Sequence, residues 1–464
     1  MTNRSKGRVA PNRTQVLTAR RAMAIWIAVT GVWSITPVVG RADTPRPAAA
    51  APIAYSDADL LNEVERRAVL YFQEKSDPVT GLTQDRAENS GVESNAAASI
   101  ASTGYALASL PIAVERQWQS RPVAQATADR TLRFLLAMPR QHGFLYHWVQ
   151  KGTGARARNS EISTVDTGLL IAGALSCGQY FGGDTLQLAQ DLYDRADWNW
   201  MLTNGGAKPD KLRLCHGWRP ETGFLRFDYG YCEAQLTYLL AMGSATHAVS
   251  PAVWLAFGRP VVEYHGISTL HAGPLFQNEM PEEYFDLRGQ RDGLGFDYWV
   301  AGTNHATIDR LYCATAFAGR TGYDPHFWGL TACDGPDGYQ VAGSPDREKG
   351  TFGPCAVVAA IDYAPQTCLD SIQTTYRTFG ARFWGRYGFG DGYNPERNWC
   401  DPYVNSLDLG MAMLAIENHR SGLIWRLMRQ NTAAGRALEA AGFHATKEAE
   451  PRPLQVTAGP PALR

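Results

Sequence analysis

Helical periodicity is the feature that most constrains this chain. Apolar residues recur with the spacing of one helix face, and each such segment is followed by a loop rich in glycine, aromatic and acidic residues. The alternation typical of strands is scarce. The segments expected to be helical are 57–75, 96–116, 122–138, 163–181, 184–202, 229–243, 249–257, 300–319, 354–363, 366–380, 403–430 and 431–441. The sequence therefore predicts a large all-α fold.

These segments also suggest how the fold closes. With 464 residues and 45% hydrophobic content, the chain can bury a large core. About a dozen helices without a long unstructured linker fit one domain, and a toroid of helical hairpins is the economical closed arrangement. Loops on a rigid scaffold are where binding residues collect. We therefore expect the functional residues in the loops.

The first 42 residues differ from the rest. Basic residues without any acid precede a weakly apolar run at 22–40, and Gly40-Arg41-Ala42 offers small residues for cleavage after Ala42. The Arg20-Arg21 pair resembles a twin-arginine signal, with Sec export or an uncleaved anchor as alternatives. We expect a periplasmic or secreted protein, with an export signal at 1–42, a Pro/Ala linker at 43–56, a folded domain at 57–445 and a disordered tail at 446–464.

Charge and cysteine content restrict the partners. Removal of residues 1–42 takes away seven basic residues and no acid, which moves the formal net charge from −1 to −8. Nucleic acids and anionic membranes need clustered Lys and Arg, so we expect neither as a partner. A neutral ligand such as an oligo- or polysaccharide fits better, bound by a monomer. The eight cysteines form no CxxC pair, so we expect no metal and no cofactor, and leave one or two disulfides open.

Two acids lie at the start of the predicted helix 163–181. Ser163 followed by Asp166 is typical of an N-cap, where the helix dipole favours a carboxylate, so Asp166 has either a capping or a binding role. Glu161 precedes the cap and has no such local role. We therefore interpret Glu161 as a candidate site residue.

Glu233 occupies an unusual position for a carboxylate. Glu233, Leu236 and Leu240 share one helical stripe, so the acid belongs to an apolar face. Desolvation raises the pKa of a buried carboxyl group, as a general acid near neutral pH requires. The alternative is a buried glutamate satisfied by an Arg or a Tyr.

The loop FGDGYNPERNWCDP, at 389–402, gathers further candidates. Asp391 and Asp401 flank Tyr393 and Trp399, and Asp408 follows at the start of a helix. Asp before Gly or Pro is also common turn chemistry. Tryptophans in or beside loops are the remaining signal, because an indole face can stack on a sugar ring: Trp218, Trp299, Trp328, Trp384 and Trp399.

Other chemistries lack their motifs. There is no G-x-S-x-G for a serine hydrolase, and no HExxH or other carboxylate–His cluster with metal-ligand spacing. DGPDG, at 334–338, hints at a calcium loop but lacks the EF-hand spacing, so we interpret it as a turn.

Four stretches carry a family resemblance. They are NSEISTVDTGLLIAGAL, DWNWM (197–201), WGLTACDGPDGY (328–339) and, above all, YGFGDGYNPERNWCDPYVNSLDLGMAMLAIENHRSGLIWRLM (387–428). Together they resemble the glycoamylase-like domain and, within it, glycoside hydrolase family 144, the bacterial endo-β-1,2-glucanases. The resemblance covers nearly all of residues 57–445. Gly392, Cys400 and VNSLDLG depart from the family pattern and leave the glucan linkage open.

The resemblance implies an (α/α)6 barrel that hydrolyses β-1,2-glucan with inversion, by carboxylates in a large cleft and without a metal. It places Glu161 and Glu233 in that cleft. An inverting pair needs carboxyl groups roughly 6.5–9.5 Å apart. We assign Glu233 as the acid and leave the base open between Glu161 and Asp391.

The other candidates would bind the sugar or position these groups. Asp166, Asp401, Asp408 and Tyr393 are expected to do so, with Trp218, Trp328 and Trp399 as platforms. A lyase acting on a uronate polymer and a glucan-binding protein without catalysis are the alternatives.

Overall fold

The structure is a computed structural model that describes residues 54–93, 97–202, 212–226, 230–270, 273–343 and 348–446. The chain divides into units 1–49 and 50–464, and every described residue belongs to the second. The predicted export signal, nearly all of the linker and nearly all of the tail lie outside the described residues. Among the residues described, no helix combines the length and apolar character needed to cross a membrane.

Helices dominate the regular structure of unit 50–464. The α-helices and one 3-10 helix are α1 (Asp57–Lys75), α2 (Ile100–Glu115), α3 (Arg121–Ala137), α4 (Thr164–Phe181), α5 (Gly183–Asp194), α6 (Trp198–Met201), α7 (Gln235–Gly243), α8 (Ala252–Ala256), α9 (Phe276–Glu282), α10 (Tyr298–Ala316), α11 (Pro354–Ala359), η1 (Ala360–Asp362), α12 (Pro365–Phe383), α13 (Ser406–Ser421), α14 (Leu423–Gln430) and α15 (Thr432–Ala440).

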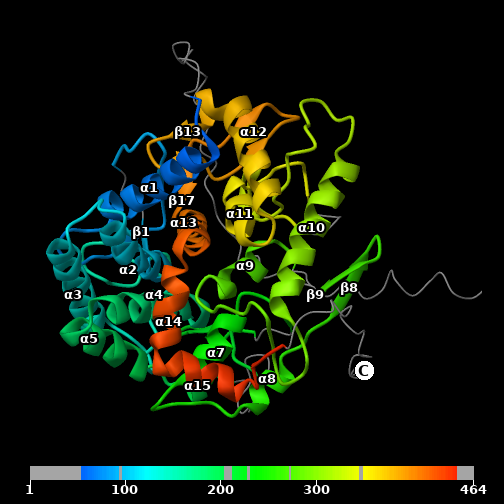
Figure 1. The fold of residues 1–464 in the computed structure, drawn as a ribbon. Helices are drawn as coiled ribbons and strands as arrows, with labels where there is room; N and C mark the ends of the chain where they lie inside the picture. Colours follow the sequence, from blue (N-terminus) through cyan, green and yellow to red (C-terminus); the bar gives the residue numbers. More distant parts are fainter. Residues whose placement is uncertain are drawn as a thin grey trace, which may run out of the picture. The chain divides into compact units, whose positions relative to one another are not determined.

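The helices form two concentric layers. In the inner layer α2 packs on α4, α4 on α7, α7 on α9, α9 on α11, α11 on α13, and α13 again on α2. This succession closes a ring. Outside it, α1 packs on α2 and α13, α5 on α4, α10 on α9 and α12 on α11 (Figure 1). The fold is therefore the all-α (α/α)6 barrel that the resemblance implied.

Three inner helices begin in the same way, with a short strand that leads into a polar N-cap. The caps Ser99, Ser163 and Asn405 precede α2, α4 and α13, and each has an extended backbone and a side chain that accepts an N–H of the first turn. The Ser102 and Ser406 hydroxyl groups, in the first turns of α2 and α13, lie 2.5 Å apart. The inner helices thus begin at a common end of the barrel.

Close contact between α2 and α4 requires glycine. A Cβ on Gly173 of α4 would overlap the carbonyl oxygen of Gly104 in α2, and a Cβ on Gly104 would overlap the backbone of Leu169 and Leu170. The two helix backbones therefore touch. This contact fixes the first-turn residues of α2 and α4 relative to each other.

Short strands fill the loops between helices. They are β1 (Thr83–Gln84), β2 (Arg86–Glu88), β3 (Ala98–Ser99), β4 (Trp148–Val149), β5 (Ile162–Ser163), β6 (Gly217–Arg219), β7 (Gly223–Phe224), β8 (Val261–Tyr264), β9 (Ile267–Leu270), β10 (Gln290–Arg291), β11 (Ala332–Gly335), β12 (Gly338–Val341), β13 (Trp384–Gly385), β14 (Gly388–Phe389), β15 (Tyr393–Asn394), β16 (Trp399–Cys400), β17 (Tyr403–Asn405) and β18 (His444–Ala445). Three-stranded sheets have the orders β1-β3-β4 and β5-β6-β7, and the other strands pair in twos.

Most predicted helices are confirmed, with several differences. The predicted helix 229–243 begins only at Gln235, so Glu233 is not on the helical stripe expected for it, and the segment 354–363 divides into α11 and η1. The segment 184–202 divides into α5 and α6, and the segment 403–430 divides into α13 and α14 at Gly422, whose backbone is left-handed. Helix α9 was not predicted, because Pro281 and two glutamates interrupt its apolar pattern. All eight cysteines are free thiols, and Cys177 and Cys313 are buried as helical core residues.

Candidate active site

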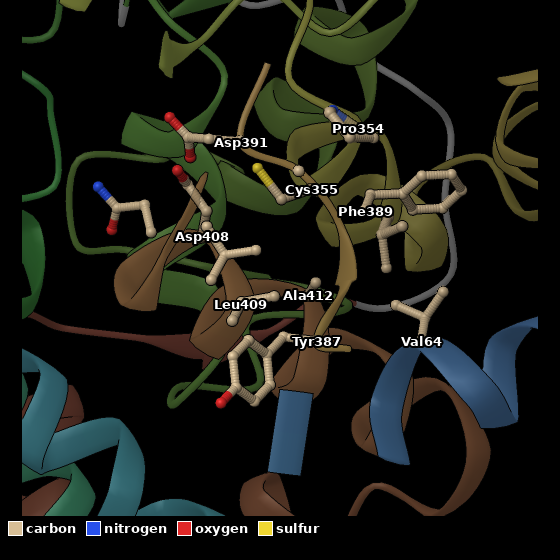
Figure 2. Close-up of a pocket in the computed structure, with 13 residues that line it drawn as sticks. Val64, Pro354, Cys355, Tyr387, Phe389, Asp391, Asp408, Leu409 and Ala412 are labelled. Carbon is tan, nitrogen blue, oxygen red and sulfur yellow. The ribbon is translucent and has the colours of Figure 1, made fainter. Parts of the chain in front are cut away.

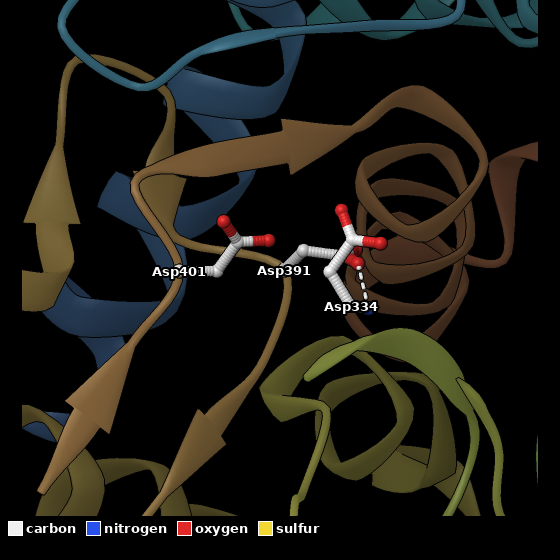
Figure 3. A group of neighbouring side chains, drawn as sticks. All are labelled: Asp334, Asp391 and Asp401. Atoms are coloured by element: carbon white, nitrogen blue, oxygen red, sulfur yellow. Dashed lines mark hydrogen bonds between the residues drawn. The ribbon is translucent and has the colours of Figure 1, made fainter. Parts of the chain in front are cut away.

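Three aspartates from separate strands and loops meet at the end of the barrel where the inner helices begin. Asp334 belongs to β11, Asp391 follows β14 and Asp401 follows β16. One carboxylate oxygen from each lies within 4.8 Å of the other two (Figure 3). The Asp334 backbone N–H donates to Asp391 Oδ2 at 2.7 Å, and the Tyr403 N–H donates to Asp401 Oδ1 at 3.0 Å. We call these three residues the acid triad.

The Gly-Asp-Gly sequence around Asp391 has a steric cause. A Cβ on Gly390 would overlap the carbonyl oxygen of Asp401, and a Cβ on Gly392 would overlap that of Asp334. Backbone bonds complete the arrangement, because the Asp391 N–H donates to the Tyr403 oxygen and the Asp401 N–H donates to the Gly392 oxygen, both at 2.9 Å. The two glycines therefore let the triad form.

Burial shapes the charge of the triad. Asp391 and Asp401 are 3% and 4% exposed. Burial, together with the charges of Asp391 and Asp334, raises the pKa of Asp401 from an ordinary value of 3.8 to about 8. Burial also raises the pKa of Asp334, although the Arg86 guanidinium opposes this through a bond to Asp334 Oδ2 at 2.5 Å. Asp401 thus holds a proton at neutral pH.

The triad offers oxygen ligands of the kind that Ca²⁺ or Mg²⁺ takes. Three of its oxygens are already engaged, however: Asp334 Oδ2 by Arg86, Asp391 Oδ2 by the Asp334 amide and Asp401 Oδ1 by the Tyr403 amide. Asp391 Oδ1 and Asp401 Oδ2 are buried and without a hydrogen-bond partner. Because Arg86 supplies positive charge and Asp401 retains a proton, the arrangement is suited to proton transfer.

A small cavity lies beside the triad. Asp391 and Asp408 line it together with Cys355, Phe389 and apolar side chains of α1, α11 and α13 (Figure 2). It has room for about one water molecule. Burial and the neighbouring Asp391 raise the pKa of Asp408 well above its ordinary value, and a hydrogen bond joins the two side chains. Asp408 is therefore the donor and Asp391 the acceptor.

Glu161 belongs to a second charged group, with His147 and Arg219. Its Oε1 lies 3.0 Å from His147 Nδ1, and its Oε2 accepts from Arg219 at 3.0 Å. Burial alone would raise the pKa of Glu161, but His147 and Arg219 lower it to about 2. Burial would lower the pKa of His147, but Asp166 and Glu161 raise it to about 9. Glu161 is a paired carboxylate and hence a poor base.

Asp166 and Glu233 also lie at helix starts. Asp166 accepts from the Ser163 hydroxyl at 2.5 Å, which is the predicted capping arrangement, and its Oδ1 lies 3.4 Å from His147 Nε2. Glu233 is half-buried and precedes α7, whose Leu236 N–H donates to its carbonyl oxygen. Glu161, Glu233 and Asp391 thus all lie near the starts of inner helices. The cavity beside Asp391 is not lined by Glu161 or Glu233.

Two predicted binding residues prove to be core residues. Trp328 is 1% exposed and donates from its indole nitrogen to the Ser371 hydroxyl. Tyr393 is also 1% exposed and packs among Phe327, Phe379 and other aromatic rings. Their rings cannot present a face to a ligand, because the hydrophobic core covers them. The predictions for Trp328 and Tyr393 were therefore wrong.

Trp218 and Trp399 are more accessible. Trp218 lies on β6, opposite Ile162, and its half-buried ring contacts Trp200 with 5.7 Å between centroids. Trp399 is half-buried on β16. The predictions of these two rings as platforms stay open.

The sequence interpretation missed Asp334, Arg86 and His147. DGPDG does form a turn, between β11 and β12, but its first residue joins the triad. Arg86 is 248 residues from Asp334 in sequence, and His147 is 14 residues from Glu161, and neither carries a motif. An acid next to a hairpin turn within the family-like stretch 328–339 was the available signal for Asp334.

Several known proteins resemble this chain. The Glycoamylase family model, described as "Putative glucoamylase", matches residues 227–432. This match covers less than half of the chain, and its description agrees with the expected glycoamylase-like domain. A curated relative is the exo β-1,2-glucooligosaccharide sophorohydrolase (non-reducing end) of Parabacteroides distasonis. The two are 24% identical over 412 residues, which is 80% of this chain and 56% of the relative, so the chain spans little more than half of that protein.

Two solved structures superimpose on this chain over nearly their whole length. The endo-β-1,2-glucanase of Chitinophaga pinensis, in complex with sophorotriose and glucose, superimposes with a TM-score of 0.77 and 25% identity, over 84% of this chain and 99% of that one. A Bacteroides uniformis protein with the same description as the family model gives a TM-score of 0.78 at 27% identity, over 85% and 99%.

Proposed function

We propose that this protein is an exported glycoside hydrolase that cleaves β-glucan, with β-1,2-glucan as the preferred substrate. By name, the Parabacteroides distasonis relative acts on β-1,2-glucooligosaccharides and the Chitinophaga pinensis protein on β-1,2-glucan, and the latter superimposes on this barrel. The observation that carries the proposal is the acid triad beside Asp408, because it gathers carboxylates at the mouth of such a barrel.

The proposed mechanism is inversion without a metal. Glu233 protonates the glycosidic oxygen, while a carboxylate activates water on the opposite face of the sugar. We assign that carboxylate to Asp391, because its Oδ1 has no hydrogen-bond partner, whereas both Glu161 oxygens are paired. Asp408 and Asp401, next to Asp391, have raised pKa values and hold protons at neutral pH.

The test is incubation of the purified protein with linear β-1,2-glucan and with a panel of β-1,3-, β-1,4- and β-1,6-glucans. We expect new reducing ends from β-1,2-glucan, and the product's first anomer, observed by NMR, should be inverted. Long oligosaccharides early in the reaction indicate endo cleavage, whereas sophorose alone indicates exo cleavage. An unsaturated product that absorbs ultraviolet light would instead indicate a lyase.

Two variants test the assigned pair. Glu233→Gln and Asp391→Asn should each bind the glucan and lose about 10²–10⁴-fold in kcat, the range of general acid–base contributions. Unchanged turnover in either variant would remove that residue from the mechanism. Binding by the wild-type protein without any product would identify a glucan-binding protein.

A further inference from the structure

Tyr339 and Tyr403 differ from the other described aromatic residues in their exposure to solvent. Within the described residues, they are the only Phe, Tyr or Trp side chains in the exposed class, at 50% and 40% exposure. Large aromatic side chains seldom stay in water unless they contact something. These two rings therefore need an explanation.

Both tyrosines are held directly against the acid triad. Tyr339 of β12 lies opposite Asp334 of β11 in the antiparallel register. Residues opposite each other share one face of a hairpin, with Cβ atoms about 5 Å apart. Tyr403 donates its N–H to Asp401 at 3.0 Å and accepts the N–H of Asp391 at 2.9 Å. Tyr339 thus shares a hairpin face with Asp334, whereas Tyr403, opposite Glu88 of β2, is joined to the triad through its backbone.

Tyr339 is accessible next to charged groups. Half of its area is open to solvent, and Asp334, opposite it in the hairpin, pairs with Arg86. Ligand sites commonly combine aromatic walls with a few convergent polar groups.

We propose that Tyr339 and Tyr403 form the aromatic walls of the saccharide site, where they contact a pyranose unit next to the acid triad. The C–H face of a pyranose is apolar and fits a tyrosine ring, while its hydroxyl groups reach the carboxylates and Arg86. This inference rests on the proposed function for the identity of the sugar. It replaces Trp328 and Tyr393, which are buried, as the aromatic contacts.

The experiment compares Tyr339→Ala, Tyr339→Phe, Tyr403→Ala and Tyr403→Phe in the full-length protein. KM and kcat are measured on linear β-1,2-glucan, and affinity is measured by calorimetry for the same glucan and for the other glucans of the panel, in an Asp391→Asn background that prevents turnover. Each Ala variant should raise KM and Kd about ten-fold, whereas each Phe variant, which keeps the ring, should change them less than about three-fold.

Tyr180→Ala is the matched control. Tyr180 is a partly exposed tyrosine near the end of α4, about 25 Å from the start of that helix. It should leave KM and Kd unchanged. Ala variants that melt at a lower temperature but keep the wild-type Kd would show that the two tyrosines are only structural, and would overturn the inference.

The outcomes separate this inference from the proposed function. If a glucan binds without being cleaved, and the Ala variants weaken its binding, the hydrolase proposal fails and the aromatic site stands. If glucan is cleaved with unchanged KM in the Ala variants, the aromatic site fails and the hydrolase stands. If no glucan of the panel binds to any form of the protein, both fail.

Discussion

Asp401 illustrates how one buried residue couples the site to pH. Its pKa is raised to about 8, so its protonated form stabilises the fold. This contribution is fully present below pH about 4 and is lost as the pH rises through about 8. The wild-type protein should therefore lose stability across the neutral range because of this group.

Asp401→Asn removes that dependence, because the amide does not ionise. We expect the free energy of unfolding of this variant minus that of wild type to increase by up to about 4 kcal/mol as the pH rises from 5 to 8.5. Thermal unfolding of both proteins at the two pH values measures the difference. Asp370→Asn, at an exposed position of α12, is the control and should show no such trend. A parallel pH profile for Asp401→Asn and wild type would contradict the raised pKa.

The stability that Glu161 contributes should change with pH in the opposite direction, because it is lost when the pH falls. The Glu161 pKa is lowered to about 2, so its contribution to stability is present above pH about 4.5 and is lost as the pH falls through 2. The His147 pKa is raised to about 9, so its contribution is present below pH about 6.5 and is lost as the pH rises through 9. Both contributions are fully present only between these limits.

Glu161→Gln tests this pairing at the atomic level. Without the carboxylate, His147 should titrate at a pH at least about one unit lower, which NMR of the imidazole protons can follow. Hydrolysis should fall less than in Asp391→Asn, because Asp391 rather than Glu161 is assigned as the base. Loss of activity equal to that of Asp391→Asn, with an unchanged His147 titration, would instead return Glu161 to the position of base.

At the scale of elements, the hairpin of β11 and β12 is decisive for the site. It carries Asp334 and Tyr339, and Gly392 sets how closely it can approach the loop of Asp391. The same loop has Gly390 against Asp401 on its other side. The triad therefore depends on two contacts between backbones rather than on side-chain packing alone.

Gly392→Ala should disturb this approach. The new methyl group would overlap the Asp334 carbonyl oxygen, so the hairpin must shift, at a cost of about 1–3 kcal/mol in stability and with a large loss of kcat. Gly435→Ala in α15 is the matched control, since a Cβ there meets nothing within 4 Å, and it should keep kcat and gain up to about 1 kcal/mol. Chemical denaturation and kinetics check both variants. Wild-type kinetics in Gly392→Ala would contradict the steric argument.

Only the tertiary structure explains why the segment of α9 is a buried helix. It carries Glu279 and Glu282, and Glu283 follows directly, and all three are nearly fully buried in the inner layer. Burial raises the pKa of each well above its ordinary value, so they are neutral in the core. Glutamates with a proline resemble a polar loop in sequence. Only the closed ring, which leaves no other place for this segment, makes it a buried helix.

At the scale of the whole molecule, the two ends of the barrel have different roles: one carries the candidate site and the other an ion network. The end where the inner helices finish holds an ion network, in which Arg116 binds Glu417 and Arg420 binds Glu65, at 2.8 and 2.5 Å. Glu65 and Glu417 are fully buried, and burial with the neighbouring Glu417 raises the pKa of Glu65 to about 8. The family-like stretch IENHRSGLIW belongs to this network and so has a structural role.

Arg420→Met should separate stability from activity. The variant leaves Glu65 and Glu417 with one fewer cation, so we expect a loss of about 3 kcal/mol in the free energy of unfolding. Arg420 lies about 18 Å along α13 from Asp408, so KM and kcat of the folded variant should be unchanged. Denaturation and steady-state kinetics on the same preparation measure both effects. A large change in KM would mean that the two ends are coupled.

Local signals in the sequence determined the helices and part of the site. Periodicity and N-caps act over a few residues, so α1, α4 and the N-cap formed by Ser163 with Asp166 could be predicted without a fold. Asp391, Asp401 and Asp408 could be grouped because one loop and the helix that follows it carry all of them. The family-like stretches added the expectation of the barrel.

The tertiary structure decided which distant groups meet. Asp334 and Arg86 join the triad, and His147 and Arg219 neutralise Glu161, across separations of tens to hundreds of residues. It also buried Trp328 and Tyr393 and left Tyr339 and Tyr403 exposed. The physical reason is that burial and ion pairing depend on how the ring of helices closes, and no short pattern of residues records that closure.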